Sequence, residues 1–170
     1  MAEQGEGQQA RPEKRSPRAV FKPLKEFGTI SVSPTTDIKF YADAYRGHTY
    51  VSMRNFLKSG DYVGPTKAGV TLTAEIIDGI TAALRRLPKD PAALKEEELA
   101  RFKRRSGAEV VVRVALFREA FGVDIREWID DADYKGWSKK GVRIPLPAVE
   151  ESLGCLDAMR AFLKETSKVS

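Results

Sequence analysis

Two aromatic–arginine pairs have the side-chain types that contact single-stranded nucleic acid. Tyr45-Arg46 and Phe117-Arg118 each follow an apolar, strand-like run and are expected at hairpin tips. An aromatic ring offers a face on which an unpaired base stacks, each stack being worth about 1–3 kcal/mol, while the neighbouring cation contacts phosphate. Trp137, expected in a turn between Gly136 and Ser138, is a further stacking candidate. These residues favour non-covalent binding.

Two expected strands carry the same combination along one face. Period-two alternation places Phe56 on the face of Arg54, and Trp128 on the face of Arg126. Asp124 shares the second of these faces and repels phosphate. Aromatic residues in strands also form cores, and exposed arginines are also simply solvated, so both interpretations stay open at these positions.

Catalysis has little support in the sequence. His48 is the single histidine and has no partner cysteine or second base, so we expect neither an enzyme, a metal site nor a cofactor. The run 130–133, Asp-Asp-Ala-Asp, is interpreted as an acidic surface turn. Cys155, near an apolar helix stripe, is expected to be a small buried residue.

The chain contains an internal repeat, which organises the elements that must position these residues. Residues 45–70 align with 117–142 at a constant offset of 72, without a gap. Identity at nine of these positions far exceeds chance and indicates duplication. The identical pairs are Arg46/Arg118, Val51/Val123, Arg54/Arg126, Asp61/Asp133, Tyr62/Tyr134, Gly64/Gly136, Lys67/Lys139, Gly69/Gly141 and Val70/Val142.

Each copy is expected to form four strands and a helix. In the first copy, turn signals at 59–61 and 63–65 precede a fourth strand that starts at Gly69, and Thr73 is the expected helix N-cap. The fold class predicted is α+β: two tandem ββββα units with curved antiparallel sheets, forming an internal pseudo-dimer or a dimer of two chains. The predicted segments are a disordered basic tail 1–27, units 28–88 and 108–164, a charged helical linker 89–107 and a tail 165–170.

The composition limits the partners. The net charge of +5 suggests a polyanion, but residues 29–84 carry equal numbers of basic and acidic groups, whereas 85–108 carry eight basic and four acidic ones. Binding by the units must therefore rest on a few well-placed groups. No apolar run is long enough for a membrane helix, the start does not resemble a secretory signal, and one cysteine fits a reducing compartment.

The repeated strands resemble a known family. The run 123–128, Val-Asp-Ile-Arg-Glu-Trp, followed by 137–142, Trp-Ser-Lys-Lys-Gly-Val, resembles the C-terminal domain of the positive-cofactor-four transcriptional coactivator family. The first copy matches through 51–56 and 66–72. The resemblance implies ββββα units that pair and bind single-stranded DNA with little sequence preference.

The resemblance also implies site residues. The run 45–48 matches the family's aromatic-basic-glycine-basic hairpin tip, whereas 117–120 keeps only the aromatic and the arginine. Together with the stacking candidates, the predicted nucleic-acid-binding residues are Tyr45, Arg46, His48, Arg54, Lys67, Phe117, Arg118, Arg126, Trp128, Trp137, Lys139 and Lys140.

The function predicted is single-stranded DNA binding, in transcriptional coactivation or regulation or in DNA maintenance. Melted duplex and the transcription machinery are further expected partners, and the expected location is intracellular and DNA-associated, in a nucleus or nucleoid. Two alternatives stay open: an RNA-binding protein that uses the same surface, and a dimerisation or scaffold module without nucleic-acid binding.

Overall fold

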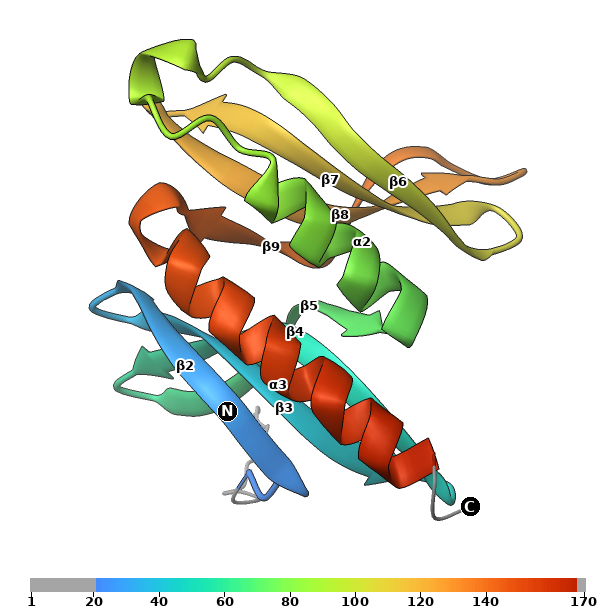
Figure 1. The fold of residues 1–170 in the computed structure, drawn as a ribbon. Coiled ribbons are helices and arrows are strands. Elements are labelled where there is room, and N and C mark those ends of the chain that lie inside the picture. Colours follow the sequence, from blue (N-terminus) through green and yellow to red (C-terminus); the bar gives the residue numbers. More distant parts are fainter. Residues whose placement is uncertain (1–20, 168–170) are drawn as a thin grey trace, which may run out of the picture.

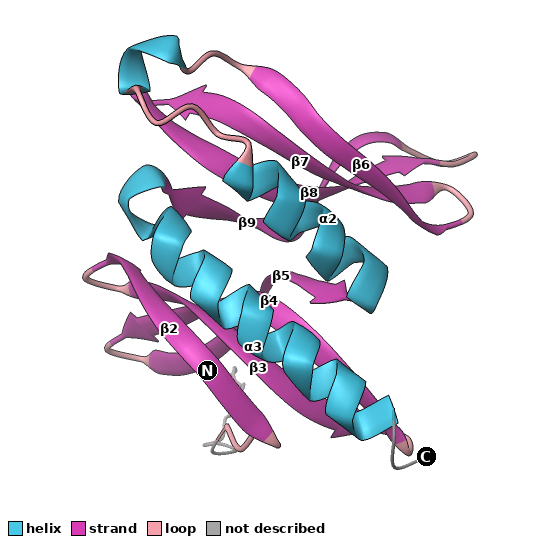
Figure 2. Ribbon diagram, viewed as in Figure 1, coloured by secondary structure: helices cyan, strands magenta, loops and turns pink. Residues whose placement is uncertain are grey.

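Two four-stranded antiparallel sheets, each followed by a helix, make up the part of the chain that the structure describes. This computed structural model describes residues 21–167 (Figures 1 and 2). The first sheet has the order β2-β3-β4-β5 and the second β6-β7-β8-β9. The α+β class with two ββββα units is therefore confirmed. The predicted disordered tail lies, for residues 1–20, outside the described range, and so do residues 168–170 of the predicted C-terminal tail.

The elements follow each other in the same order in both units. The first unit comprises β2 (Lys25–Ser33), β3 (Thr36–Tyr45), β4 (His48–Ser59), β5 (Tyr62–Leu72) and α2 (Ala74–Arg85). A 3-10 turn, η2 (Pro91–Ala93), leads to the second unit. The second unit comprises β6 (Glu97–Arg105), β7 (Ala108–Phe117), β8 (Ala120–Asp130), β9 (Lys135–Pro145), the 3-10 turn η3 (Leu146–Ala148) and α3 (Val149–Ser167).

The duplication extends to the strand register. Tyr45 pairs with His48 at the first hairpin tip, and Phe117 pairs with Ala120 at the second. A bulge follows Arg54 in β4, and another follows Arg126 at the equivalent point of β8. The backbone of the two copies is thus alike where the predicted site residues lie.

The prediction of a helical linker at 89–107 is wrong. Glu97–Arg105 forms strand β6, which pairs with β7. The Glu- and Arg-rich sequence has good intrinsic helix propensity, but β7 would otherwise leave one edge unpaired, and tertiary pairing outweighs such propensity. The predicted tail 1–27 is likewise too long, because β2 starts at Lys25.

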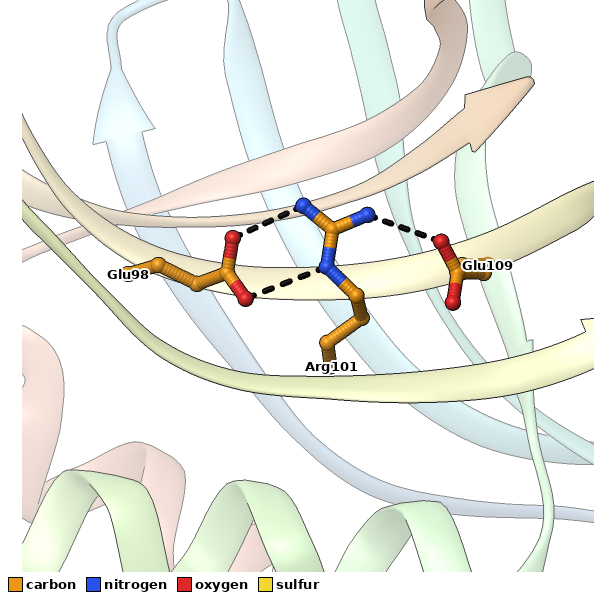
Figure 3. A network of polar contacts seen from close by, with 3 residues as sticks. All are labelled: Glu98, Arg101 and Glu109. Carbon is orange, nitrogen blue, oxygen red and sulfur yellow. Dashed lines mark hydrogen bonds and ion pairs between the residues drawn. The ribbon is translucent and has the colours of Figure 1, made fainter. Parts of the chain in front are cut away.

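Charged side chains across β6 and β7 support this pairing. Arg101 donates hydrogen bonds to Glu98 on its own strand, at 2.7 and 3.1 Å, and to Glu109 on β7 at 2.8 Å (Figure 3). The bonds from Arg101 lower the pKa of Glu98. Glu98 and Arg101 are three residues apart, and they share a face because the strand is bulged between Glu98 and Ala100.

The fourth strand of each unit starts earlier than predicted. Residues 63–65, interpreted as a turn, belong to β5, and Trp137, also placed in a turn, belongs to β9. Tyr62 explains the first case, since its hydroxyl donates to the carbonyl of Pro65 at 2.6 Å and its ring covers Gly64. Side-chain contacts within the hairpin thus extend its strands into sequence rich in turn-forming residues.

Helix α2 begins as predicted at Thr73, whose hydroxyl accepts a hydrogen bond from the backbone N–H of Ile76 at 3.2 Å. Ile76, Ile77, Ile80 and Leu84 are buried and form the apolar stripe of this helix. Cys155 on α3 is also buried, as predicted.

Each helix contacts the sheet of the other unit. Helix α3 lies along β2 and β3, and α2 contacts β6 (Figure 1). Cys155 of α3 packs so closely on β2 that a Cβ added to Gly28 would lie 2.4 Å from its Sγ. Gly79 of α2 lies against the ring of Phe102 on β6 in the same way. The buried side chains of both units consequently belong to one hydrophobic cluster.

The two sheets also meet directly, through β5 and β9. On each sheet, alternate residues such as Phe40 and Met53 point into the core. Their neighbours point away from it, toward what we call the outer face; Lys39 and Arg54 pair directly there. Both outer faces carry the strand arginines that the sequence singled out.

Candidate nucleic-acid interface

The two hairpin tips share one geometry. Tyr45 and Phe117 are 61% and 58% exposed, and the guanidinium carbon of the following arginine lies 5.1 and 5.2 Å from the ring centre, respectively. Both arginines have positive φ, 52° at Arg46 and 49° at Arg118, which turns each side chain back over its neighbour. Each tip therefore presents a ring and a cation as one unit.

The tips differ in the next residue and in their support. Gly47 has a φ of 79°, which suits glycine, whereas Glu119 takes the equivalent position with a φ of 65°. The second tip is supported by Arg143, whose guanidinium lies 5.8 Å from the Phe117 ring centre and donates to the Ala120 carbonyl at 2.7 Å. Sequence analysis missed Arg143, because the first copy has Thr71 at this position.

His48 is exposed at the start of β4, with its ring centre 6.3 Å from that of Tyr50. The two rings extend the aromatic surface of the first tip along β4. Neither tip lines one of the pockets described below.

In each unit, the repeated strand arginine lies opposite the repeated glycine of the neighbouring strand. Arg54 pairs with Gly69 across β4 and β5, and Arg126 pairs with Gly141 across β8 and β9. A Cβ on either glycine would lie 2.7 Å from the arginine side chain opposite. The glycines therefore leave the space in which each arginine lies across the sheet.

The two arginines differ in what they bind. Arg54 donates from Nε to the hydroxyl of Tyr41 at 3.1 Å and from Nη1 to the carbonyl of Thr66 at 3.0 Å. The side chain of Arg126 makes no hydrogen bond or ion pair with another residue in the described part of the chain. Among the described residues, the guanidinium of Arg54 thus has internal partners, whereas that of Arg126 has none.

The outer face of the second sheet carries an open pair of indole rings. Trp128 and Trp137 face each other across β8 and β9, with ring centres 4.8 Å apart and an interplanar angle of 80°. Trp137 is 38% exposed, and the guanidinium of Arg113 lies 5.7 Å from its ring centre. A pocket of about 240 Å³ next to this ring is lined by Arg113, Asp124, Arg126, Trp137 and Ser138.

Asp124, which sequence analysis expected to repel phosphate, has a cationic partner. Its carboxylate lies 3.4 Å from Nη1 of Arg143. The acid is thus partly neutralised, and Arg113 and Arg126 leave the pocket with positive charge next to an exposed ring. This combination suits a base with its phosphate.

The same face of the first sheet is covered. Phe56 is only 4% exposed, and its ring packs edge-on against that of Phe21 at 4.6 Å between centres. Tyr41 also meets Phe21, at 5.0 Å. Phe56 is therefore a packed residue in this structure and not an exposed stacking platform.

A second pocket, of about 200 Å³, lies where the two units meet, and we call it the seam. Arg54, Lys67 and Thr71 line it from the first unit, and Arg104, Glu127 and Lys140 from the second. Arg104 donates to the carbonyl of Thr71 at 2.7 Å, and its Nε lies 3.4 Å from the carboxylate of buried Glu127. Four cations thus line the same pocket as one carboxylate, which pairs with Arg104.

The seam brings together three of the predicted residues, Arg54, Lys67 and Lys140. Lys139 is exposed on β9 but does not line it. Arg104 was missed, because its segment was interpreted as a helix. The alternation of Arg101, Phe102 and Lys103 was the available signal for a strand there.

Other repeated or acidic residues stabilise the hairpins. Tyr134 donates from its hydroxyl to the carbonyl of Trp137 at 2.8 Å, as Tyr62 does in the first unit. Asp131 accepts hydrogen bonds from the backbone N–H groups of Asp133 and Tyr134, both at 2.9 Å. The acidic run 130–133 is therefore a turn in which the Asp131 carboxylate accepts hydrogen bonds from the backbone.

The remaining chemistry is sparse. Among the described residues, no group of three or more His, Cys, Asp or Glu side chains is arranged to hold a metal ion. Burial, with a smaller effect of Glu151, raises the pKa of the Cys155 thiol to about 11, so that the thiol is protonated at neutral pH. No helix in the described range is long and apolar enough to span a membrane.

The site therefore consists of two ring-and-arginine tips, one open tryptophan pair with two cations, and a cationic seam. No protein-family model matches this chain, and no curated protein matches it either.

Proposed function

We propose that this protein binds single-stranded DNA with little sequence preference, as a transcriptional coactivator or regulator or as a DNA-maintenance protein. The observation that carries the proposal is the open Trp128–Trp137 pair with Arg113 and Arg126 beside it. Stacking on a ring accepts any base, and a guanidinium contacts any phosphate, so this arrangement has no means of reading sequence.

The seam supports a path for the phosphate backbone between the units. Arg54, Lys67, Arg104 and Lys140 line it, whereas the units as a whole are nearly neutral. A strand that lies on the second sheet's outer face and continues across the seam meets cations from both units. Binding by this route is weakened by salt, because bound phosphates release counterions.

We also propose that the chain forms an internal pseudo-dimer. Each helix contacts the other unit's sheet, β5 lies beside β9, and the core is one cluster. The resemblance of residues 51–56 and 123–128 to the positive-cofactor-four family, whose units pair, points the same way. Native mass spectrometry should give a single chain of 18.9 kDa; twice that mass would support exchange between two chains instead.

The test of DNA binding is a titration of a fluorescent oligo-dT strand, followed by anisotropy at several salt concentrations. Replacing both Arg113 and Arg126 with alanine should weaken binding and reduce the salt slope by about 1.4, since each single-strand phosphate contact contributes about 0.7. The matched control replaces Arg85 and Arg160 with alanine. Those arginines pair with Asp157 and Asp78 on the helices, so the same loss of charge should leave affinity nearly unchanged.

Unlabelled competitors separate the alternatives. Single-stranded DNA that competes better than RNA or duplex of the same length supports the proposal. Preferential competition by RNA favours an RNA-binding protein. No binding of any strand at low salt contradicts nucleic-acid binding and favours a scaffold module.

A further inference from the structure

The outer face of the first unit holds a cluster of three aromatic rings. Phe21 contacts Tyr41 and Phe56 edge-on, with ring centres 5.0 and 4.6 Å away, and Tyr41 and Phe56 lie 5.9 Å apart. Tyr41 and Phe56 belong to neighbouring strands of the sheet, whereas Phe21 belongs to the segment before β2. The pair on the sheet is thus covered by the protein's own chain.

The rings on the sheet have cations beside them, as a site for a nucleobase and its phosphate needs. The ammonium of Lys39 lies 5.5 Å from the centre of the Phe56 ring. Arg54 holds the hydroxyl of Tyr41 and also reaches the seam, where Lys67 lines the same pocket. Without Phe21, this face offers a ring surface next to phosphate-binding groups.

In the second unit, no further ring from the described residues packs on the equivalent pair, Trp128 and Trp137. Trp128 corresponds to Phe56 in the repeat, and its partner Trp137 is 38% exposed. Phe56, by contrast, is 4% exposed. Within residues 21–166, the ring contacts of the two tryptophans are with each other and with the Arg113 side chain.

We propose that Tyr41 and Phe56 form a second stacking site for an unpaired nucleobase, and that Phe21 occupies this site in the free protein. The inference rests on the proposed function. A strand that binds both units must displace Phe21 from the first unit, whereas the second unit is open from the start. Phe21 is then an internal competitor that weakens binding to the first unit.

The segment that carries Phe21 is attached in a way that permits exchange. Residues 21–23 have no regular secondary structure, and among the described residues the first backbone hydrogen bond to the sheet is from Leu24 to the carbonyl of Ala42, at 2.9 Å. Phe21 packs on the outer face, outside the buried cluster that joins the units. Its release therefore uncovers rings without opening the core.

Exchange of one ring contact for another is close to balanced, because base stacking and side-chain ring packing are similar interactions. If Phe21 occupies the stacking site in most molecules, the apparent affinity for the strand equals the intrinsic affinity multiplied by the fraction of molecules in which the site is open. With a ring contact of ordinary strength, removal of Phe21 should tighten binding at the first unit by about fivefold.

The experiment compares Phe21→Ala with Leu24→Ala in the full chain, by anisotropy of labelled oligo-dT. Leu24 belongs to the same segment and is 58% exposed, so its change removes a similar apolar side chain without uncovering rings. Both changes are made in the wild type and in a Trp128→Ala, Trp137→Ala background, in which the first unit dominates binding. Phe21→Tyr tests for rescue, and Phe21→Gln repeats the measurement if the alanine variant unfolds below the assay temperature.

We expect Phe21→Ala to tighten binding about fivefold in the tryptophan-free background. Phe21→Tyr and Leu24→Ala should stay within about twofold of their parent. At a strand concentration below saturation, a 5-bromo-deoxyuridine strand should crosslink more strongly to the peptides that carry Tyr41 and Phe56 when Phe21 is absent, because the strand then has no competitor for the site. Unchanged or weaker binding by Phe21→Ala, with wild type that still binds oligo-dT, overturns this inference alone. Failure of wild type and every variant to bind overturns the proposed function as well.

Discussion

The two units share a backbone but differ in what covers their outer faces. Both have a bulge after the strand arginine, both place that arginine across a glycine, and both end a hairpin with a ring and a guanidinium. In the first unit, Arg54 has two internal partners and Phe56 is covered. In the second, Arg126 has no partner among the described residues and Trp137 is exposed.

The difference shows that the two copies share their backbone geometry more closely than the exposure of their outer-face side chains. Register and bulges depend on the backbone and on a few glycines, so they persist in both copies. The exposure of the outer-face rings depends on single side chains such as Phe21. Phe21 has no counterpart in the repeat, because it lies outside the aligned residues. Four predictions test this contrast, in order of decreasing effect.

Loss of both indole rings should have the largest effect on binding. Trp128→Ala combined with Trp137→Ala removes two stacking surfaces, and we expect oligo-dT affinity to fall about 100-fold, or about 3 kcal/mol. Phe56→Ala, the matched change in the first unit, should lower stability but leave affinity nearly unchanged, because Phe21 already covers this ring in the free protein. Equal losses of affinity from the two units would show that they contribute alike.

Stability should depend on the contacts between each helix and the other unit's sheet. Gly28→Ala should lower the free energy of unfolding by about 2 kcal/mol, because the new methyl group meets Cys155 Sγ. Urea denaturation measures this loss, and Cys155→Ala should restore most of it in the double variant. Failure of the double variant to recover would show that the strain lies elsewhere on β2.

The two strand arginines should separate binding from stability. Arg126→Ala should weaken oligo-dT binding several-fold and change stability by less than about 0.5 kcal/mol. Arg54→Ala should lower stability by about 1–2 kcal/mol through loss of its bonds to Tyr41 and Thr66. Thermal melting and anisotropy on both variants give the comparison; the same stability loss in each would contradict it.

The hairpin tips should show the smallest effect. Glu119→Gly should raise stability by about 0.5–1 kcal/mol, because Glu119 has a φ of 65° that glycine adopts more easily. Removal of the acid should also tighten binding slightly. Gly47→Glu should do the reverse in the first unit, and the two melting temperatures should move in opposite directions.

Much of the fold was predictable from local pattern. The offset of 72 predicted two equivalent units, and Thr73 with the isoleucines after it predicted α2 correctly. The hairpin tips at Tyr45 and Phe117 were predictable because strand alternation stops there. These features depend on residues close in sequence, which is why the sequence suffices for them.

Strand β6 and the seam were not predictable in this way. Residues 97–105 favour a helix locally and become a strand because β7 offers an unpaired edge. Arg104 then reaches Thr71 and Glu127, which are far from it in sequence. No spacing rule connects these three residues, so the seam required the folded arrangement.

The sequence by itself determined that there are two copies and which residues end the hairpins. Only the tertiary structure decided that each helix packs on the other unit's sheet, that four cations meet at the seam, and that Phe21 covers the first ring pair while the second stays open. The reason is the range of the interactions. Turns, caps and alternation are settled within a few residues, whereas packing and burial depend on which distant segments pair.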